Sequence, residues 1–465
     1  MTNSHEGRTL RWRVLIAKRG GSEVLVAGEP ARFHLPEIRI PQHERVARHL
    51  NREIQRLCNL QVVSIAPIIL EDEVVEDAAA RYHTAETVSS STEASQDFKW
   101  AHVSELAADA FRNTQDGLAF QWFCDRAGMP LRDETPFGHL GWFAELCDWL
   151  RQQIGPRAWD GAFEQFQASA SFSLIPFETK PRCAWFKAVG ESNAREFRIT
   201  QELAESYSEF VPRLIATRPE WNAWLAEECE GRDLTEIAEP KIWEKAAHTL
   251  AELQIATMAG TVPLLHAGAQ QLRGMFAAPV VDRFFVLAET LVSRNEGATG
   301  EDLPPIVLDS MKAQIKELVR REEDLQIPDA LGHLDLNSGN AIVSAERCTY
   351  LDWAEAYVGP PFLTFEYLLQ SFRRRFGRIS QEEHAVVESY LGVWEASAPR
   401  FNVRDAWAFT PALAVFAYAQ RCLFAAEPYQ LEPSRFTDYL LALLRKLNRE
   451  LAHGTTQKDG VSSCA

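Results

Sequence analysis

A short polar stretch, LGHLDLNSGN at residues 331–340, contains His333, Asp335 and Asn340 between apolar neighbours. Polar groups are costly to bury unless they are paired, so such a stretch indicates either a polar loop or a site. A carboxylate can orient an attacking hydroxyl and an amide oxygen can help to hold Mg²⁺, which are two requirements of phosphoryl transfer. The spacing alone is weak evidence because it also arises by chance, so the interpretation depends on further residues of matching chemistry.

Three further residues could complete this chemistry. Asp352 lies at the end of the run CTYLDW, where a second metal-binding carboxylate is expected after Asn340. Lys187 lies in AWFKAV, an apolar run typical of a strand, so its charge needs either a partner or a strand end from which it can reach water. Glu196 opens the next expected helix and could reach back to the lysine, and Glu202 on the same helix is the alternative partner.

The elements that would position these residues follow from the spacing of apolar side chains. Five strand-like runs between 163 and 229, with one helix at 194–206, predict a small β-rich lobe. From 239 onward the pattern is mostly helical, except for a short hairpin expected at 340–353. The polar loop and Asp352 would therefore lie in a helical lobe that follows the lobe with Lys187.

The stretch IPDALGHLDLNSGNAIVS, continued by CTYLDWAEAYVGPPFLTFEYLL, resembles the aminoglycoside phosphotransferase and choline kinase-like family. That family's loop usually reads H-G-D-x-x-x-x-N, followed by a strand and then I-D-W or I-D-F. The earlier stretch FKAVGESNAREFRITQELAESYSEFVPRLIATRPEWNAWLAEECEGRDL is similar to the family's first lobe. The resemblance covers about 160–450 and implies a two-lobed protein-kinase-like fold, with a structural role for His333 inside the loop.

The resemblance also implies roles for the residues of the pattern. Asp335 corresponds to the catalytic base, and Asn340 and Asp352 correspond to the ligands of Mg²⁺. Lys187 would contact the α- and β-phosphates of ATP, with Glu196 as its partner. These residues occur in the order that the family requires, which makes the combination much more specific than the loop alone.

Two more parts of the nucleotide site, and one departure, follow from the same resemblance. Backbone groups from Glu227 to Cys229 would hold the adenine, and the turn with Ser169 and Ser171 would cover the phosphates. The family often carries a Ser-containing turn there, so the missing G-x-G-x-x-G pattern counts little against it. Leu334 replaces the usual Gly, and a bulky side chain beside the base is expected to affect backbone geometry or the room for substrate.

The first part of the chain resembles the Nudix hydrolases more weakly. Their box, G-x5-E-x7-R-E-U-x-E-E-x-G-U with U an aliphatic residue, keeps its register here at Glu44 and at the run REI of 52–54. The positions of the metal-binding Glu pair hold Arg56 and Leu57, and the first Gly position holds Ile38. A cation there repels Mg²⁺, so the resemblance implies a degenerate domain without hydrolysis that binds a ligand or serves as a scaffold. The alternative is an unrelated α/β module in which the box arises by chance.

The expected organisation has five parts, and the fold class is α+β: a two-lobed protein-kinase-like fold preceded by a small α/β Nudix-like domain. A helix is expected from about Ser104 near the end of the first domain. The parts are the degenerate Nudix-like domain at 1–133, a helical connector at 134–160, the small lobe at 161–232, the helical lobe at 233–452 and a disordered tail at 453–465.

The composition excludes some functions. With 465 residues, 46% hydrophobic and 24% charged, the chain has the composition of a globular protein of several domains. A formal net charge of −17 argues against nucleic acid and anionic membrane surfaces as partners. Eight dispersed cysteines, with no apolar signal segment at the start, indicate reduced thiols and a cytoplasmic location.

Together these observations predict an ATP- and Mg²⁺-dependent phosphotransferase that moves the γ-phosphate to a hydroxyl of a small molecule. The alternative is a kinase-fold protein that binds nucleotide or ligand without turnover. A third possibility is that the first domain senses a nucleotide and controls the kinase-like part. The acceptor stays open among an antibiotic, an amino alcohol and a sugar, as do the oligomeric state and the choice between ATP and GTP.

Overall fold

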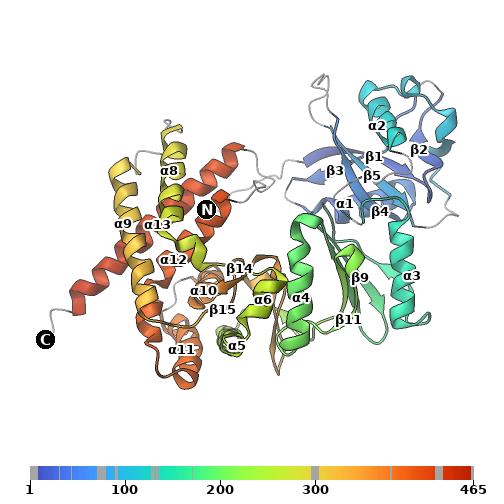
Figure 1. Ribbon diagram of the computed structural model, residues 1–465. Coiled ribbons are helices and arrows are strands. Elements are labelled where there is room, and N and C mark those ends of the chain that lie inside the picture. Colours follow the sequence, from blue (N-terminus) through green and yellow to red (C-terminus); the bar gives the residue numbers. More distant parts are fainter. Residues whose placement is uncertain are drawn as a thin grey trace. The chain divides into compact units, whose positions relative to one another are not determined.

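The computed structural model describes residues 9–30, 32–42, 44–70, 80–88, 93–126, 131, 135, 137–169, 171–294, 303–377, 380–424 and 433–461. The chain divides into two units (Figure 1). Unit 1 comprises Met1–Phe197 and Arg213–Glu228, and unit 2 comprises Arg198–Pro212 and Cys229–Ala465. Within the described residues, no helix combines the length and the apolar character needed to span a bilayer.

The first sheet of unit 1 is mixed, with the strand order β4-β5-β1-β2-β6 and with β3 paired to β1. Its central strand β1 runs parallel to β5 and antiparallel to β2 and β3. From Val14 to Ala17 the side chains of β1 alternate between two buried clusters, one on each face, which explains why this half of the strand is continuously apolar. The strands are β1 (Thr9–Ala17), β2 (Glu23–Ala27), β3 (Glu37–Pro41), β4 (Val62–Ile68), β5 (Ala80–Thr87) and β6 (Phe98–His102).

Helix α1 (Val46–Cys58) covers one face of this sheet. Ala47, Leu50, Ile54 and Cys58 are buried at helical spacing, and the helix ends where Asn59 adopts a left-handed conformation. The other helices that begin in unit 1 are α2 (Thr114–Asp125), α3 (Trp142–Ile154) and α4 (Ala194–Ser206). Helix α4 passes from unit 1 into unit 2, to which its residues 198–206 belong.

The helix expected from Ser104 begins later than predicted. Residues Val103–Glu105 and Ala108–Ala110 form two short 3₁₀ turns, η1 and η2. The α-helix starts at Thr114, because the side chain of Asn113 accepts a hydrogen bond from the backbone N–H of Gln115 at 2.8 Å and caps the first turn.

The second sheet of unit 1 has the order β11-β12-β10-β9-β7, with β8 paired to β9, and all its pairs are antiparallel. It has six strands instead of the five expected, because the run FEQFQAS divides into the end of β7 and a separate two-residue strand. The strands are β7 (Trp159–Phe163), β8 (Gln167–Ala168), β9 (Phe172–Thr179), β10 (Ala184–Val189), β11 (Leu214–Arg218) and β12 (Ala223–Glu227), with 3₁₀ turns η3 (Glu191–Asn193) and η4 (Pro219–Trp221).

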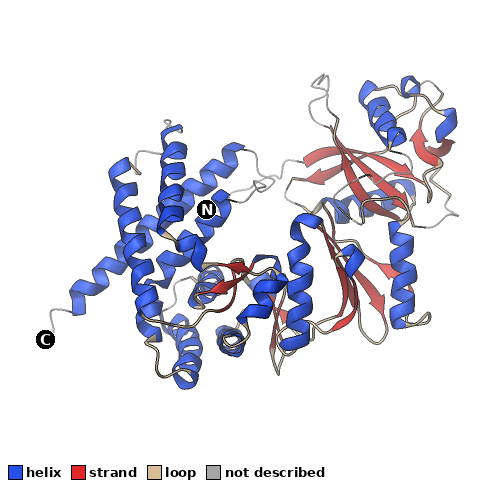
Figure 2. Ribbon diagram, viewed as in Figure 1, coloured by secondary structure: helices blue, strands red, loops and turns tan. Residues whose placement is uncertain are grey.

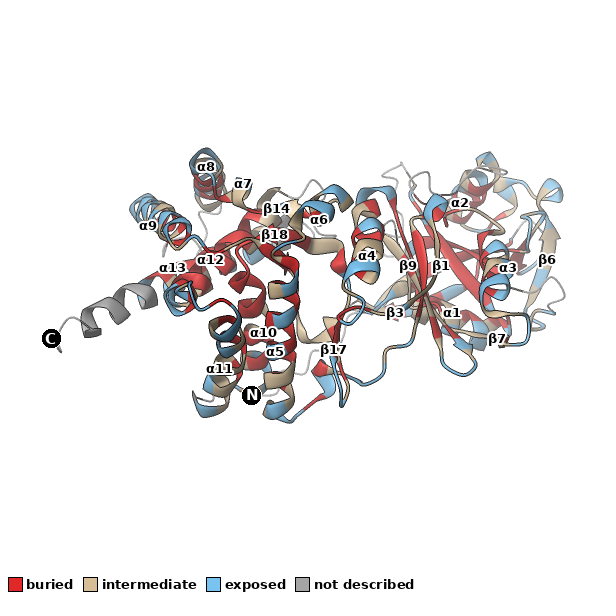
Figure 3. Cartoon of the chain, turned by 60° about the horizontal axis from the view of Figure 1, so that its bottom comes forward, coloured by how far each residue is buried: buried red, intermediate tan, exposed pale blue. Residues whose placement is uncertain are grey.

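One hydrophobic core joins the two sheets of unit 1. It includes Leu15 of the first sheet, Trp142 and Leu146 of α3, and Ile175 and Phe186 of the second sheet. Figure 3 shows β1 largely in the colour of buried residues, whereas buried and intermediate residues alternate along β9. The stretch expected as a connector is therefore part of a continuous core that links the expected first domain to the expected small lobe.

Unit 2 is mainly helical and contains two small three-stranded sheets, ordered β13-β16-β17 and β14-β18-β15 (Figure 2). The hairpin expected at 340–353 corresponds to β16 and β17. The strands are β13 (Arg232–Asp233), β14 (Gln270–Gln271), β15 (Ala330–His333), β16 (Ala341–Val343), β17 (Cys348–Tyr350) and β18 (Ala356–Gly359), with 3₁₀ turns η5 (Leu234–Glu236), η6 (Ser338–Asn340) and η7 (Trp353–Glu355).

The helices of unit 2 pack around a single large core. The last helix continues through 453–461, the first part of the stretch expected to be a disordered tail, and residues 462–465 lie outside the described part. The helices are α5 (Pro240–Thr257), α6 (Thr261–Ala267), α7 (Arg273–Phe276), α8 (Ala278–Arg294), α9 (Pro305–Asp324), α10 (Phe362–Phe376), α11 (Ser380–Ser397), α12 (Val403–Phe424) and α13 (Pro433–Val461).

Candidate functional site

The polar loop of unit 2 begins at the end of β15 and is anchored to the core there. Gly332 allows this close packing, because a Cβ at that position would lie 2.0 Å from the ring of Tyr357. The backbone N–H of His333 donates to the hydroxyl of Thr364 at 2.9 Å, and that of Leu334 donates to the carbonyl of Glu355 at 3.0 Å. The residues before Asp335 are therefore fixed to α10 and to the segment that follows Asp352.

His333 links the loop to the strand that leads to Asp352. The backbone N–H of Asp335 donates to His333 Nδ1 at 3.0 Å, so the ring proton lies on Nε2, which is 3.3 Å from the carbonyl oxygen of Leu351. Burial lowers the pKa of His333, which agrees with this neutral tautomer. The side chain is 1% exposed, so its position indicates an organising role within the loop.

Asn340 is held beside Asp335 by the same loop. Its side-chain nitrogen donates to the backbone carbonyl of Asp335 at 3.0 Å, and its amide oxygen takes no part in that hydrogen bond. Asn337 donates to the same carbonyl at 3.2 Å and accepts from the N–H of Gly339 at 2.9 Å, closing the turn. The backbone of Leu351 donates to the carbonyl of Asn340 at 2.9 Å, so Asn340 is tied to the residue next to Asp352.

Asp352 has an unusual backbone. Its φ of 65° and ψ of 58° are left-handed, a conformation that costs most residues other than Gly on the order of 1 kcal/mol or more. The residue lies between β17 and η7 and its side chain is exposed. Asn340 and Asp352 thus bring an amide and a carboxylate to one end of the hairpin, a donor set that suits Mg²⁺.

Further charged and aromatic groups surround Asp335. Burial raises the pKa of its carboxyl, while the neighbouring His333 and Arg421 act to lower it. Arg421, on α12, forms an ion pair at 2.6 Å with Glu355 and lies 5.7 Å from the ring of Tyr418. Sequence reasoning missed these groups of α12, because no local pattern marks them and only the fold brings them to the loop.

Leu334 is buried in the core and is 0% exposed, so its side chain takes no room on the exposed side of the loop. We expect Leu334→Ala to lower the free energy of unfolding by about 2–5 kcal/mol, as other buried Leu→Ala changes do. Urea denaturation would measure this, with Ile306→Ala, at a side chain 77% exposed, as the control. Unchanged stability together with higher turnover in Leu334→Ala would contradict this expectation.

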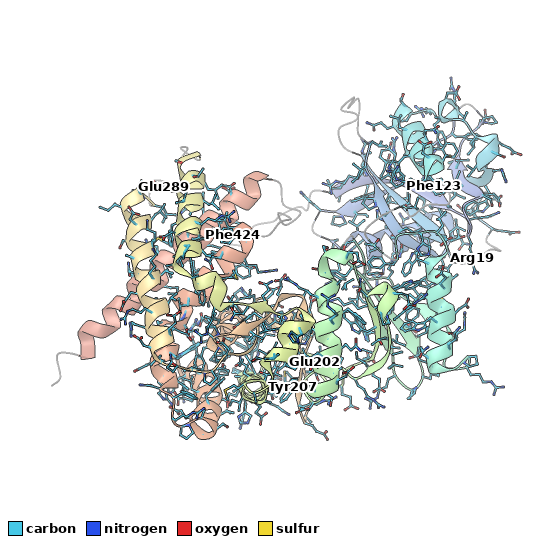
Figure 4. All side chains as sticks on the ribbon, in the orientation of Figure 1. Arg19, Phe123, Glu202, Tyr207, Glu289 and Phe424 are labelled. Atoms are coloured by element: carbon cyan, nitrogen blue, oxygen red, sulfur yellow. The ribbon has the colours of Figure 1, made fainter. Side chains whose placement is uncertain are left out.

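In unit 1, Lys187 lies on β10 opposite Leu174 of β9 and Trp224 of β12. Its Nζ is 2.5 Å from Glu196 Oε1, and the two side chains are 13% and 2% exposed. The alternative, Glu202, which Figure 4 labels, follows Glu196 by six residues on α4 and accepts a hydrogen bond from Ser206 at 3.0 Å. The structure therefore pairs Lys187 with the acidic residue in the first turn of α4.

The expected phosphate turn joins β8 to β9. The backbone N–H of Ser169 donates to the carbonyl of Phe172 at 3.0 Å, and the N–H of Gly190 donates to the carbonyl of Ser171 at 2.9 Å. Lys187 Nζ lies 5.1 Å from the centre of the Phe172 ring, so the end of the turn adjoins the lysine. Ala170 lies outside the described residues.

The expected adenine-binding segment falls at the boundary of the units. Its first two backbone N–H groups are engaged within unit 1, where Glu227 donates to the carbonyl of Arg213 at 2.9 Å and Glu228 donates to that of Cys183 at 3.0 Å. Cys229 begins the next part of unit 2.

The predicted site residues thus form two groups, each arranged within its own unit. Unit 1 brings Lys187 together with Glu196 and with the end of the turn at 169–171. Unit 2 brings Asp335 together with Asn340 and the segment that ends at Asp352.

The carboxylates of the Nudix-like box have other partners. Glu44 precedes α1 and is 3.1 Å from His49, and Glu53 is bonded to Arg56 at 2.7 Å. Within the described part of the chain, no group of three or more His, Cys, Asp or Glu side chains is arranged to hold a metal ion.

Several solved structures are similar to this chain. An ethanolamine kinase from Plasmodium vivax is 14% identical, with a TM-score of 0.44, over 74% of this chain and 92% of its own. A putative aminoglycoside phosphotransferase from Ralstonia eutropha is 16% identical, with a TM-score of 0.46, over 67% and 98%. A choline kinase from Streptococcus pneumoniae is 17% identical, with a TM-score of 0.43, over 65% and 99%.

The sequence comparisons single out one segment of the chain. No curated protein matches the chain. A family model described as the phosphotransferase enzyme family matches residues 186–399. This segment contains Lys187, Glu196, Asp335, Asn340 and Asp352, which therefore lie in a part of the chain that has the sequence pattern of the phosphotransferase enzyme family, whereas the turn at 169–171 precedes it.

Proposed function

We propose that this protein is an ATP- and Mg²⁺-dependent phosphotransferase that transfers the γ-phosphate to a hydroxyl of a small molecule. The observation that supports this most is the loop of unit 2, in which His333 and Asn340 hold Asp335 beside the segment that ends at Asp352. The loop lies in the segment that matches the phosphotransferase enzyme family.

Asp335 would act as the base. Both side-chain amides of the loop bond to its backbone carbonyl and its backbone N–H bonds to His333, so the carboxylate is oriented without using its own oxygens. Burial raises the pKa of this carboxyl, which makes it a stronger proton acceptor than a solvated Asp. It would orient the acceptor hydroxyl and accept its proton as the new oxygen–phosphorus bond forms and the bond from the γ-phosphorus to the bridging oxygen of the leaving ADP breaks.

Asn340 and Asp352 would hold Mg²⁺ through one amide and one carboxylate oxygen. Phosphate oxygens and water complete the shell of such an ion, which neutralises the negative charge of the phosphates. Lys187, held by Glu196, would contact the α- and β-phosphates, and the turn of Ser169 and Ser171 would cover them.

For residues 1–133 we propose a degenerate Nudix-like domain that does not hydrolyse pyrophosphates. The supporting observation is that Glu44 and Glu53 of the box are engaged with His49 and Arg56. A location in the cytoplasm is part of the same proposal, because the dispersed cysteines have the pattern of reduced thiols.

The test is ATP and GTP turnover by the full chain with Mg²⁺ over a panel of amino alcohols, aminoglycosides and sugars. Turnover that depends on one class of acceptor, with stoichiometric phosphorylation of its hydroxyl, is the expected result. Tight nucleotide binding without turnover on any acceptor would favour the alternative of a binding protein. A chain that binds neither nucleotide in the presence of Mg²⁺ would contradict both.

A further inference from the structure

Helix α1 of the first domain presents two arginines to the segment that connects β7 to β8. Arg48 binds Glu164 in a bidentate manner, with Nε 2.9 Å from Oε1 and Nη2 3.1 Å from Oε2. Arg52 Nη2 lies 2.5 Å from the same Oε1. Partial burial acts to raise the pKa of Glu164, but the two arginines outweigh it and lower that pKa. One carboxylate of the second sheet is thus bound by two cations of the first domain.

The next residue, Gln165, is bound to the first domain as well. Its side-chain oxygen accepts from Asn51 Nδ2 at 2.9 Å and from the backbone N–H of Ser64 at 2.7 Å. Its side-chain nitrogen donates to the carbonyl of Ser64 at 3.0 Å. Gln165 is 1% exposed, and these hydrogen bonds pair both the oxygen and the nitrogen of its buried amide. The amide thus bonds to the backbone of β4 much as a neighbouring strand would.

Phe166 completes this contact. The guanidinium of Arg48 lies 4.4 Å from the centre of the Phe166 ring, and that ring stacks on Trp185 of β10 at 5.6 Å. Its backbone N–H donates to the carbonyl of Leu174 on β9 at 2.9 Å. Three consecutive residues, 164–166, are therefore each held by α1 or β4 of the first domain.

This segment leads directly into the turn at 169–171. β8 has only two residues, paired as Gln167 with Leu174 and Ala168 with Ser173, and such a short strand holds a turn weakly by itself. The strand that leaves the turn begins at Phe172, whose ring adjoins Lys187 Nζ. The contacts at 164–166 are therefore the anchor on the entry side of the turn.

We propose that α1 is a clamp that positions the turn at 169–171 for nucleotide binding, with Arg48, Arg52 and Glu164 as positioning residues. This inference rests on the proposed function, because that function assigns the phosphates to the turn. The inference also explains the arginines of α1. In a Nudix hydrolase the corresponding helix would carry metal-binding carboxylates, whereas α1 carries cations that bind Glu164 of the second sheet. The clamp acts on the nucleotide and leaves the acceptor side unaffected.

The experiment uses the full chain with Glu164→Gln, which keeps the shape of the side chain and removes its charge. We expect the Kd and KM for Mg·ATP to rise by roughly 2- to 30-fold, the usual range for coupling through such contacts, with the KM of the acceptor unchanged. Hydrogen exchange at the backbone of 167–172 should become faster. The matched control is Glu53→Gln, which breaks an ion pair with Arg56 on the same helix that does not involve the second sheet.

The outcomes separate the clamp from the proposed function. If the wild-type chain binds Mg·ATP and Glu164→Gln binds it equally well, the clamp is wrong and the phosphotransferase stands. If the wild-type chain binds no nucleotide, the proposed function fails, and faster exchange at 167–172 in Glu164→Gln alone still decides whether the contacts anchor the turn. If Glu164→Gln does not fold, Arg52→Gln serves instead, because that side chain is 58% exposed and Arg48 keeps its bidentate bond.

Discussion

Replacing Asp335 by Asn should reduce turnover by about 10²- to 10⁴-fold, the usual contribution of a general base, while Mg·ATP still binds. Asn has nearly the shape of Asp but cannot accept the proton of the acceptor hydroxyl. The hydrogen bonds that the structure gives to Asp335 are made by its backbone: its N–H donates to His333 and its carbonyl accepts from Asn337 and Asn340. The substitution therefore removes the carboxylate and keeps the loop.

The measurement is kcat together with the Kd of Mg·ATP, each compared with the wild-type chain. The matched control is Asp309→Asn, at a side chain of the same unit that is 71% exposed and pairs with Lys312 on α9. If the turnover of Asp335→Asn is close to the wild-type value, the proposal that Asp335 acts as the base is wrong. Loss of nucleotide binding in that variant would instead mean that its carboxylate is needed to bind the nucleotide.

The loop of unit 2 was accessible from sequence because its parts are close along the chain. His333, Asn340 and Asp352 lie within twenty residues, and the apolar runs between them predict the hairpin that the structure has as β16 and β17. Leu334 and Leu336 are buried, 0% and 1% exposed, whereas Asp335 between them, in the turn that follows β15, is only partly buried. The expectation that Leu334 crowds Asp335 considered only the size of its side chain, and the local sequence does not reveal that the fold buries this side chain in the core of unit 2.

Contacts between distant parts of the chain could not be predicted in this way. Arg48 and Glu164 are separated by 116 residues, and nothing in the local pattern of either distinguishes it from a solvated surface charge. Arg421 is a similar case, because only the packing of the helices of unit 2 brings this residue of α12 close to Glu355 and Asp335. Local spacing also overlooked β8, since a two-residue strand exists only through its pairing with β9.

The ion pair of Lys187 and Glu196 supports a second large effect, on stability as well as on activity. Both side chains are nearly buried, 13% and 2% exposed, so the removal of one charge leaves the other uncompensated. Lys187→Met should lower the free energy of unfolding by about 3–5 kcal/mol, the usual cost of breaking a buried pair. It should also abolish measurable turnover, because the phosphates lose their cation on unit 1.

Stability and nucleotide binding can be separated with a second substitution. Glu196→Leu in the background of Lys187→Met removes the uncompensated carboxylate, so the double variant should regain most of the lost stability, because replacing both members of a buried pair by apolar side chains of similar size is often close to neutral. It should not regain affinity for Mg·ATP, because the cation is still missing. Urea denaturation and nucleotide titration of the two variants and the wild-type chain measure both effects. A double variant that recovers both stability and nucleotide affinity would mean that Lys187 serves the fold of unit 1 alone and has no part in binding phosphate.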